Sequence, residues 1–148
     1  MPSNDDESRQ REALINDESR KREALIPSAW RKFYEATHVP AAVRAGGVLH
    51  VTGHTGERLD GVFSEDVEEQ VRGTFRNIAL TLAEAGLDWS NVVELNSYHV
   101  GLQDQAEVLL AVAAEFLQDP FPAWTAVGVT ELIDPEAVIE ISCVAVFP

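Results

Sequence analysis

The last strand-like segment of the chain, residues 137–146, is apolar on both of its faces. Alternation would place one set of side chains on one face (Ile139, Ile141, Cys143, Ala145) and a second set on the other (Val138, Glu140, Ser142, Val144). An antiparallel sheet with one face in water alternates more cleanly than this. Because the chain offers only two long helices, which can cover one face, we predict that the other face meets another subunit in an obligate homo-oligomer.

The order of elements follows from periodicity and from turn residues. Short apolar runs at 41–45 and 48–54, separated by Gly46 and Gly47, predict a β-hairpin. Ser64 is expected to cap a helix that Gly86 ends, and Asp104 a second helix. Further strands are predicted at 91–100, 123–129 and 137–146. The order is β-β-α-β-α-β-β, an α+β fold whose mixed five-stranded sheet is covered on one face by two helices.

An 11-residue duplication opens the chain: residues 6–15 return as residues 17–26 with one substitution. The i, i+4 pairs Glu7–Arg11 and Glu18–Arg22 favour a short helix weakly. Residues 1–26 are therefore interpreted as a polar extension that frays or adds one short helix, or as a docking arm for a partner. Pro27 ends it, and residues 27–148 are the predicted domain.

The net charge of −14 excludes whole classes of partner, because nucleic acids and anionic membranes repel such a field. No apolar run is long enough to cross a bilayer, and the N-terminus does not have the pattern of a signal peptide. Cys143 is the one cysteine, so no internal disulfide can form, and we expect a cytoplasmic protein. No phosphate-binding loop or Rossmann glycine pattern occurs, so no cofactor is expected.

Glu140 is the candidate for chemistry, since it is the one carboxylate in an apolar strand. Burial would raise its pKa toward the range useful for general acid–base catalysis. The alternative is a structural glutamate at a strand edge, or one bonded to a backbone amide across an interface. Trp124 is either a core or interface residue, or a flat wall on which a planar ligand stacks.

The histidines do not predict a metal site. His50 and His54 would share one strand face, but about 13 Å apart, which is too far to bind one ion. His54 follows Thr52 and Gly53 at a strand end, where it either reaches a cleft or is an exposed hairpin residue.

Four segments together resemble the RidA (YjgF) family. They are VLHVTGH at 48–54, the helical run at 69–86, PAWTAV at 122–127 and VIEI at 138–141, and the similarity covers about residues 34–147. The resemblance implies a chorismate-mutase-like subunit in a homotrimer, with ligand pockets in the clefts between subunits. The string at 122–130 is similar to a YjgH-like branch of the family.

The family resemblance also implies roles for individual residues. RidA proper hydrolyses reactive imines such as 2-iminopropanoate, using a glutamate that corresponds to Glu140 and an arginine that holds the substrate carboxylate. That arginine is Trp124 here, and an indole cannot replace a bidentate arginine. The family's serine before glycine is Thr52 before Gly53, and its tyrosine and cysteine positions are Val39 and Ala126.

Two functions of different classes follow. The first is a RidA-like hydrolase or deaminase for an imine, enamine or related C–N compound other than the small 2-imino acids. In it Glu140 deprotonates water, Thr52 and Gly53 orient the attacked group, and Trp124, His54, Val39 and Ala126 line the pocket. The second is a non-catalytic trimer that senses or sequesters a metabolite, which the loss of polar residues at Val39, Trp124 and Ala126 favours.

Overall fold

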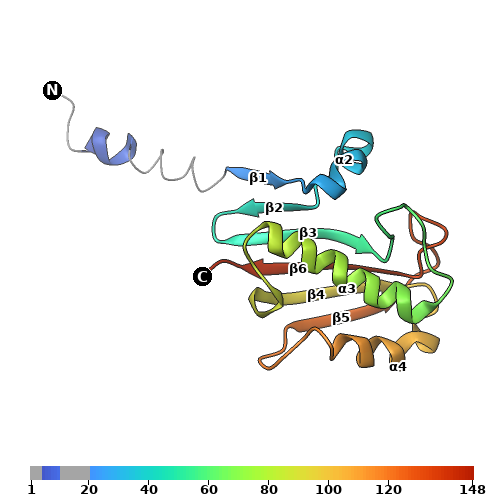
Figure 1. The fold of residues 1–148 in the computed structure, drawn as a ribbon. Coiled ribbons are helices and arrows are strands. Elements are labelled where there is room, and N and C mark those ends of the chain that lie inside the picture. The colour runs from blue at the N-terminus through green and yellow to red at the C-terminus, as the bar shows by residue number, and fades with distance from the viewer. Residues whose placement is uncertain (1–4, 11–20) are drawn as a thin grey trace.

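The computed structural model describes residues 5–10 and 21–148, and its main feature is a six-stranded mixed sheet (Figure 1). The strands are β1 (Arg22–Leu25), β2 (Ala42–Ala45), β3 (Val48–Thr55), β4 (Val92–His99), β5 (Ala123–Gly128) and β6 (Ile139–Val146), in the order β1-β2-β3-β6-β4-β5. Among the strand pairs of the described residues, only β4–β5 is parallel. The helices are α2 (Arg31–Thr37), α3 (Val67–Glu84) and α4 (Leu102–Ala113), with 3₁₀ turns η1 (Ser28–Trp30) and η2 (Trp89–Asn91).

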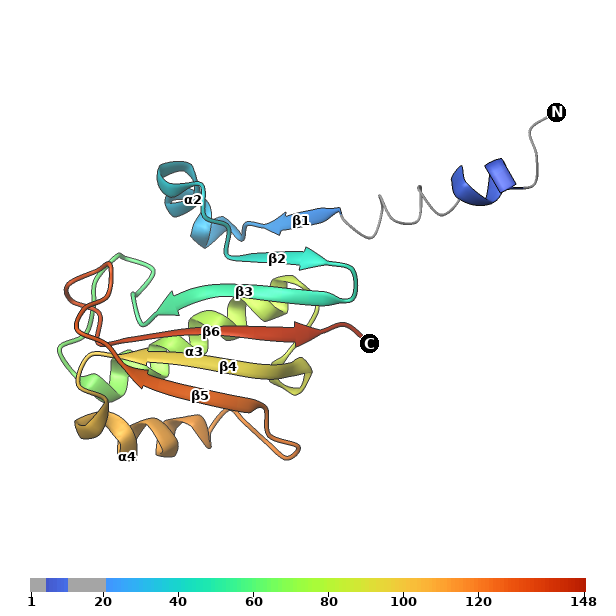
Figure 2. The same cartoon turned by 180° about the vertical axis from the view of Figure 1, so that it is seen from behind.

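Helices α3 and α4 lie on the same face of the sheet, and the opposite face is open (Figures 1 and 2). The core lies between the helices and the sheet, and its fully buried side chains include Phe75, Ile78, Leu82, Leu95, Ile139 and Ile141. The open face carries apolar side chains as well, among them Val43, Val48, Tyr98, Val127, Val144 and Val146. The predicted α+β fold, with two helices on one face of a mixed sheet, is confirmed.

The two expected helix caps are both wrong, although both helices exist. Asp66 caps α3, because its carboxylate accepts from the Glu68 amide at 3.0 Å, while Ser64 holds the preceding turn. α4 begins after Gly101, which has φ +88°, and Asp104 lies in the first turn. An acidic side chain is favourable in that turn through the helix dipole, so its sequence signature resembles that of a cap.

Gly86 ends α3 as predicted, in the left-handed conformation with φ +74°. The Leu87 amide donates to Leu82 O at 2.9 Å, and the Gly86 amide donates to Ala83 O at 2.9 Å. These two bonds define a Schellman motif, in which a glycine supplies the positive φ at no steric cost. The hairpin of β2 and β3 around Gly46 and Gly47 is also confirmed.

β1, which no sequence signal predicts, comes from the second copy of the duplication. Arg22–Leu25 pairs antiparallel with β2, and Leu25 packs against the core from the sheet edge. The expectation of a helix is therefore wrong for this part of the repeat, while residues 6–10 of the first copy are helical. Pairing of β1 with β2 crosses the expected boundary at Pro27, and the remaining repeat residues, 11–20, lie outside the described part of the chain.

Replacement of Leu25 by aspartate is expected to lower the free energy of unfolding by roughly 2 kcal/mol, because a charge would replace an apolar contact with the core. Urea unfolding of Leu25→Asp measures this loss. Leu59→Asp is the matched control, because Leu59 is a leucine with 81% of its surface exposed. An equal loss in both variants would contradict the contact of Leu25 with the core.

Candidate functional site

A β-bulge in β3 creates the local geometry of the candidate site. Val51 pairs with Cys143 and His54 with Ile141, so Thr52 and Gly53 together lie opposite the single residue Ser142. The polar groups of Thr52 are bonded on the side away from β6: its amide donates to Ala41 O at 3.0 Å and its hydroxyl to Pro40 O at 2.7 Å. The hydroxyl proton is thus donated to Pro40 O, and the hydroxyl oxygen can accept a hydrogen bond from a ligand.

The Glu140 side chain lies directly over Gly53. A Cβ atom built on Gly53 would be 2.8 Å from both Cδ and Oε1 of Glu140, so glycine is required for this approach. Glu140 is half-buried on the open face of the sheet, and burial raises the pKa of its carboxyl group. Among the ion pairs of the described residues, none involves Glu140. The site therefore presents a carboxyl group without a fixed cation, beside an irregular strand.

His54 does not reach a cleft, nor is it an exposed hairpin residue. The bulge turns its side chain to the helix-covered face, where it is 1% exposed, whereas His50 faces the open side with Val144. The expected common face of His50 and His54 is wrong for the same reason. Burial lowers the pKa of His54 to about 4, against a hydrogen bond to Thr52 that raises it.

Trp124 and Glu140 lie on opposite faces of the sheet. Trp124 pairs with Leu95 and Ala126 with Ser97, both on the helix-covered side, whereas Glu140 pairs with Tyr98 on the open side. The indole N–H donates to the Ser97 hydroxyl at 2.8 Å and is partly buried against the core. A single subunit therefore does not bring Trp124 and Ala126 together with Glu140.

A buried polar network, which the sequence analysis missed, anchors Trp124. His99 contacts the Ser97 hydroxyl through Nε2 at 2.8 Å and Gln105 Oε1 through Nδ1 at 2.9 Å. The Gln105 amide donates to Val100 O at 2.7 Å and thereby ties α4 to the end of β4. The spacing of Ser97 and His99 by two residues within β4 is the only sequence signal for this network, and the same spacing of polar residues is typical of an exposed strand face.

Val39 lies at the edge of the bulge region and is 37% exposed. Its carbonyl accepts from the Trp30 indole at 2.9 Å, and the next residue, Pro40, accepts the Thr52 hydroxyl. Val39 is thus connected to Thr52 through one residue of backbone. Of the predicted site residues, the structure brings together Glu140, Thr52 and Gly53, whereas Val39 only precedes the residue that accepts the Thr52 hydroxyl.

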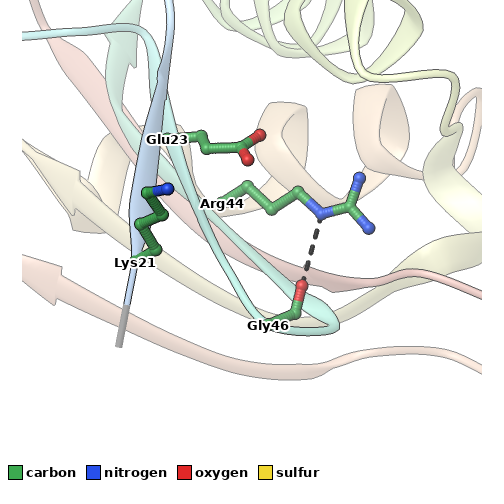
Figure 3. Close-up of a pocket in the computed structure, with 4 residues that line it drawn as sticks. All are labelled: Lys21, Glu23, Arg44 and Gly46. Carbon is green, nitrogen blue, oxygen red and sulfur yellow. Dashed lines mark hydrogen bonds between the residues drawn. The ribbon is translucent and has the colours of Figure 1, made fainter. Parts of the chain in front are cut away.

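In the part of the chain that the structure describes, neither Arg44 nor Arg58 forms an ion pair with Glu140 to supply a positive charge there. Arg44 lines a hollow of about 410 Å³ with Lys21, Glu23 and Gly46 at the β1–β2 edge (Figure 3). Its Nε donates to Gly46 O at 3.3 Å, and its guanidinium lies 3.9 Å from the centre of the Phe147 ring. Arg58 is exposed and pairs with Asp60 at 3.1 Å.

The described residues contain no group of three or more His, Cys, Asp or Glu side chains that could hold a metal ion. Cys143 is buried on the face opposite to Glu140, and burial raises the pKa of its thiol to about 12, so it stays protonated. Within residues 5–10 and 21–148, no helix combines the length and apolar character needed to span a bilayer. The chemistry available at the bulge is thus that of a carboxyl group with a raised pKa acting on water or on a bound ligand.

Comparison with known proteins places this chain and its fold in a family. Residues 31–147 match the family model described as endoribonuclease L-PSP. The chain belongs to the endoribonuclease L-PSP family. Within it, the RutC family protein YjgH of Escherichia coli is 38% identical over 107 residues, which cover 72% of this chain and 82% of that protein. The solved structure of protein YjgH has a TM-score of 0.79 at 36% identity and covers 86% of this chain and 97% of its own.

Some members of the endoribonuclease L-PSP family have a named enzymatic activity. The 2-iminobutanoate/2-iminopropanoate deaminase of Dermatophagoides farinae is 29% identical over 107 residues, 71% of this chain and 82% of that enzyme. The expected resemblance to the RidA (YjgF) family and to its YjgH-like branch is confirmed by the family match and by both comparisons with YjgH.

Proposed function

We propose that this protein is a hydrolase of the deaminase type that acts on an imine, an enamine or a related C–N compound. The observation that carries the proposal is the Glu140 carboxyl group, which has a raised pKa and lies over Gly53 at the β3 bulge on the open face of the sheet. A relative with named deaminase activity supports the reaction class.

In the proposed reaction, the Glu140 carboxylate accepts a proton from water while the water oxygen attacks the imine carbon. The electron pair of the C=N bond moves to nitrogen, which takes the proton from Glu140, and a carbinolamine forms. The Glu140 carboxylate then accepts the hydroxyl proton of the carbinolamine and passes it to the amino nitrogen, so that the C=O bond forms, the C–N bond breaks, and ammonia and a carbonyl compound leave. Burial raises the pKa of Glu140, and a raised pKa suits both halves of this cycle because the group must accept a proton and then donate it.

The charge around Glu140 supports a substrate without a carboxylate. Arg44 and Arg58 are engaged elsewhere, and Trp124 stands at the position of the family arginine. A carboxylate beside Glu140 would be repelled with no fixed cation to offset the repulsion. We therefore propose a neutral or apolar imine, rather than the small 2-imino acids, as the substrate class.

We further propose a cytoplasmic homotrimer with its pockets between subunits. The apolar side chains of the open face support association, since a sheet face in water would be more polar. Trp124 and Glu140 lie on opposite faces of one sheet, so the two can line a common pocket only when they come from different subunits.

The alternative proposal is a non-catalytic trimer that binds a metabolite. The uncharged residues Val39, Trp124 and Ala126 favour it, because each stands at a family position that is polar in RidA proper. A bound ligand that leaves with its mass unchanged would support the binder over the enzyme. The ribonucleolytic activity in the family's description is not proposed, because a net charge of −14 opposes binding of a polyanion.

The test is hydrolysis of freshly generated imines, one neutral and aromatic, one a small 2-imino acid, with ammonia as the readout. Glu140→Gln is expected to lower turnover at least about a hundredfold, because the amide cannot accept the proton from water. Glu94→Gln is the matched control, since Glu94 is an exposed carboxylate on the same face. Equal rates for Glu140→Gln and the unmodified protein would remove Glu140 from the mechanism and contradict the proposal.

A further inference from the structure

His54 is held from three sides, by its own strand and by two elements that are distant in the sequence. Its Nδ1 lies 2.6 Å from Thr52 O, within the bulge, and its Nε2 lies 2.8 Å from the Thr81 hydroxyl on α3. The Trp30 ring packs against the imidazole in a tilted arrangement, with 4.5 Å between ring centroids and 31° between ring planes. A buried ring with both nitrogens bonded and one face covered has a single available orientation.

The hydrogen-bond partners fix the tautomer of this imidazole. A backbone carbonyl can only accept, so Nδ1 carries the proton and donates it to Thr52 O. Nε2 is then the acceptor, and the Thr81 hydroxyl donates to it. The ring is neutral in this state, which agrees with the direction in which burial moves its pKa.

The Thr52 carbonyl is the point at which this network reaches the candidate site. Thr52 and Gly53 are the two bulged residues, and the Glu140 carboxyl group rests on Gly53 with no room for a Cβ. A rotation of the Thr52–Gly53 peptide would therefore move the surface that supports Glu140. The bond from His54 restrains that peptide from the opposite face of the sheet.

We propose that His54 is a positioning residue, which holds the Thr52–Gly53 bulge in the conformation that supports the Glu140 carboxyl group. This inference rests on the proposed function, in which that carboxyl group accepts a proton from water. His54 itself touches no reacting atom, because it is buried on the helix-covered side.

The Trp30 contact extends this positioning to the N-terminal part of the chain. Trp30 precedes the segment that matches the family model, residues 31–147, and its indole N–H is fixed by Val39 O at 2.9 Å. Trp30 thus covers the imidazole while its own indole is held by Val39, and the next residue, Pro40, accepts the Thr52 hydroxyl. The segment 30–40 therefore restrains the bulge both through His54 and directly through Thr52.

Two substitutions of similar polarity separate positioning from mere stability. His54→Asn places an amide N–H near the position of Nδ1, where it can still donate to Thr52 O, but it loses the Thr81 contact. His54→Gln places its amide near the position of Nε2, where it meets Thr81 but not Thr52. Both variants remove the imidazole and its packing against Trp30, so each is the control for the other.

The readouts are kcat and KM for the imine hydrolysed by the unmodified protein, and titration of the Glu140 carboxyl carbon by NMR. We expect His54→Gln to lower kcat at least tenfold and to shift the Glu140 titration, with KM within about twofold. His54→Asn is expected to retain kcat within about threefold and the original titration. Thr81→Val, which keeps the Thr52 bond, is expected to behave like His54→Asn.

If both His54 variants keep the kcat and the Glu140 titration of the unmodified protein, the inference is overturned. The proposed function still stands in that case, provided that Glu140→Gln is inactive. Equal losses in both variants would also overturn it, because they would indicate a structural role alone. If Glu140→Gln stays fully active, the proposed function fails, and the NMR titration still tests whether His54 positions the carboxyl group.

Discussion

Replacement of Gly56 by alanine is expected to lower the free energy of unfolding by at least about 3 kcal/mol. Gly56 directly follows β3 and packs against α3, where an added Cβ would lie 2.3 Å from Gln70 O and 2.8 Å from Gln70 Cα. Those atoms belong to the helix backbone, so the clash cannot be relieved by rotation of a side chain. Either α3 or the end of β3 must move, and both border the core.

Gly47→Ala is the matched control, because a Cβ there meets nothing within 4 Å and Gly47 does not have a positive φ. We expect it to be neutral or slightly stabilising, since alanine lowers the entropy of the unfolded chain. Urea unfolding of both variants at one pH gives the comparison. A Gly56→Ala variant as stable as Gly47→Ala would contradict the close approach of β3 and α3.

The regular elements of this fold could be predicted because each carries its own periodic signal. The apolar spacing along α3 and the left-handed stop at Gly86 are local properties, so they survive without knowledge of the rest of the chain. β1 has no such signal: Arg22–Leu25 reads as helix in isolation, and it becomes a strand because the β2 edge offers unpaired backbone groups and a place for Leu25. Tertiary contacts decide such segments.

The candidate site was predictable in its residue types but not in its geometry. Glu140 stood out as the single carboxylate of an apolar strand, and the structure places it over Gly53. The bulge that brings them together shifts the alternation of β3 by one residue, which sends His54 to the core. A glycine within a strand often indicates a bulge, and Gly53 is such a glycine within β3.

Acid is expected to destabilise this protein through His54. The folded protein binds this proton only below about pH 4, whereas the unfolded chain binds it below about pH 6.5. Between these values the unfolded state holds more protons, so the stability due to neutral His54 is complete above pH 6.5 and is lost as the pH falls toward 4. From pH 7 to pH 5 the loss from this residue is about 2 kcal/mol.

The variant His54→Asn separates this contribution from the other titrating groups. His99, whose pKa burial also lowers, keeps its share of the acid loss in the variant. Glu140 changes the stability in the opposite direction, because its pKa is raised by burial and protonation at lower pH removes the cost of burying its charge. We therefore expect urea unfolding at pH 7, 6 and 5 to give a shallower fall of stability for His54→Asn than for the unmodified protein. Parallel curves for the two proteins would mean that His54 is protonated in the folded state, and would contradict the donor and acceptor roles assigned to its ring.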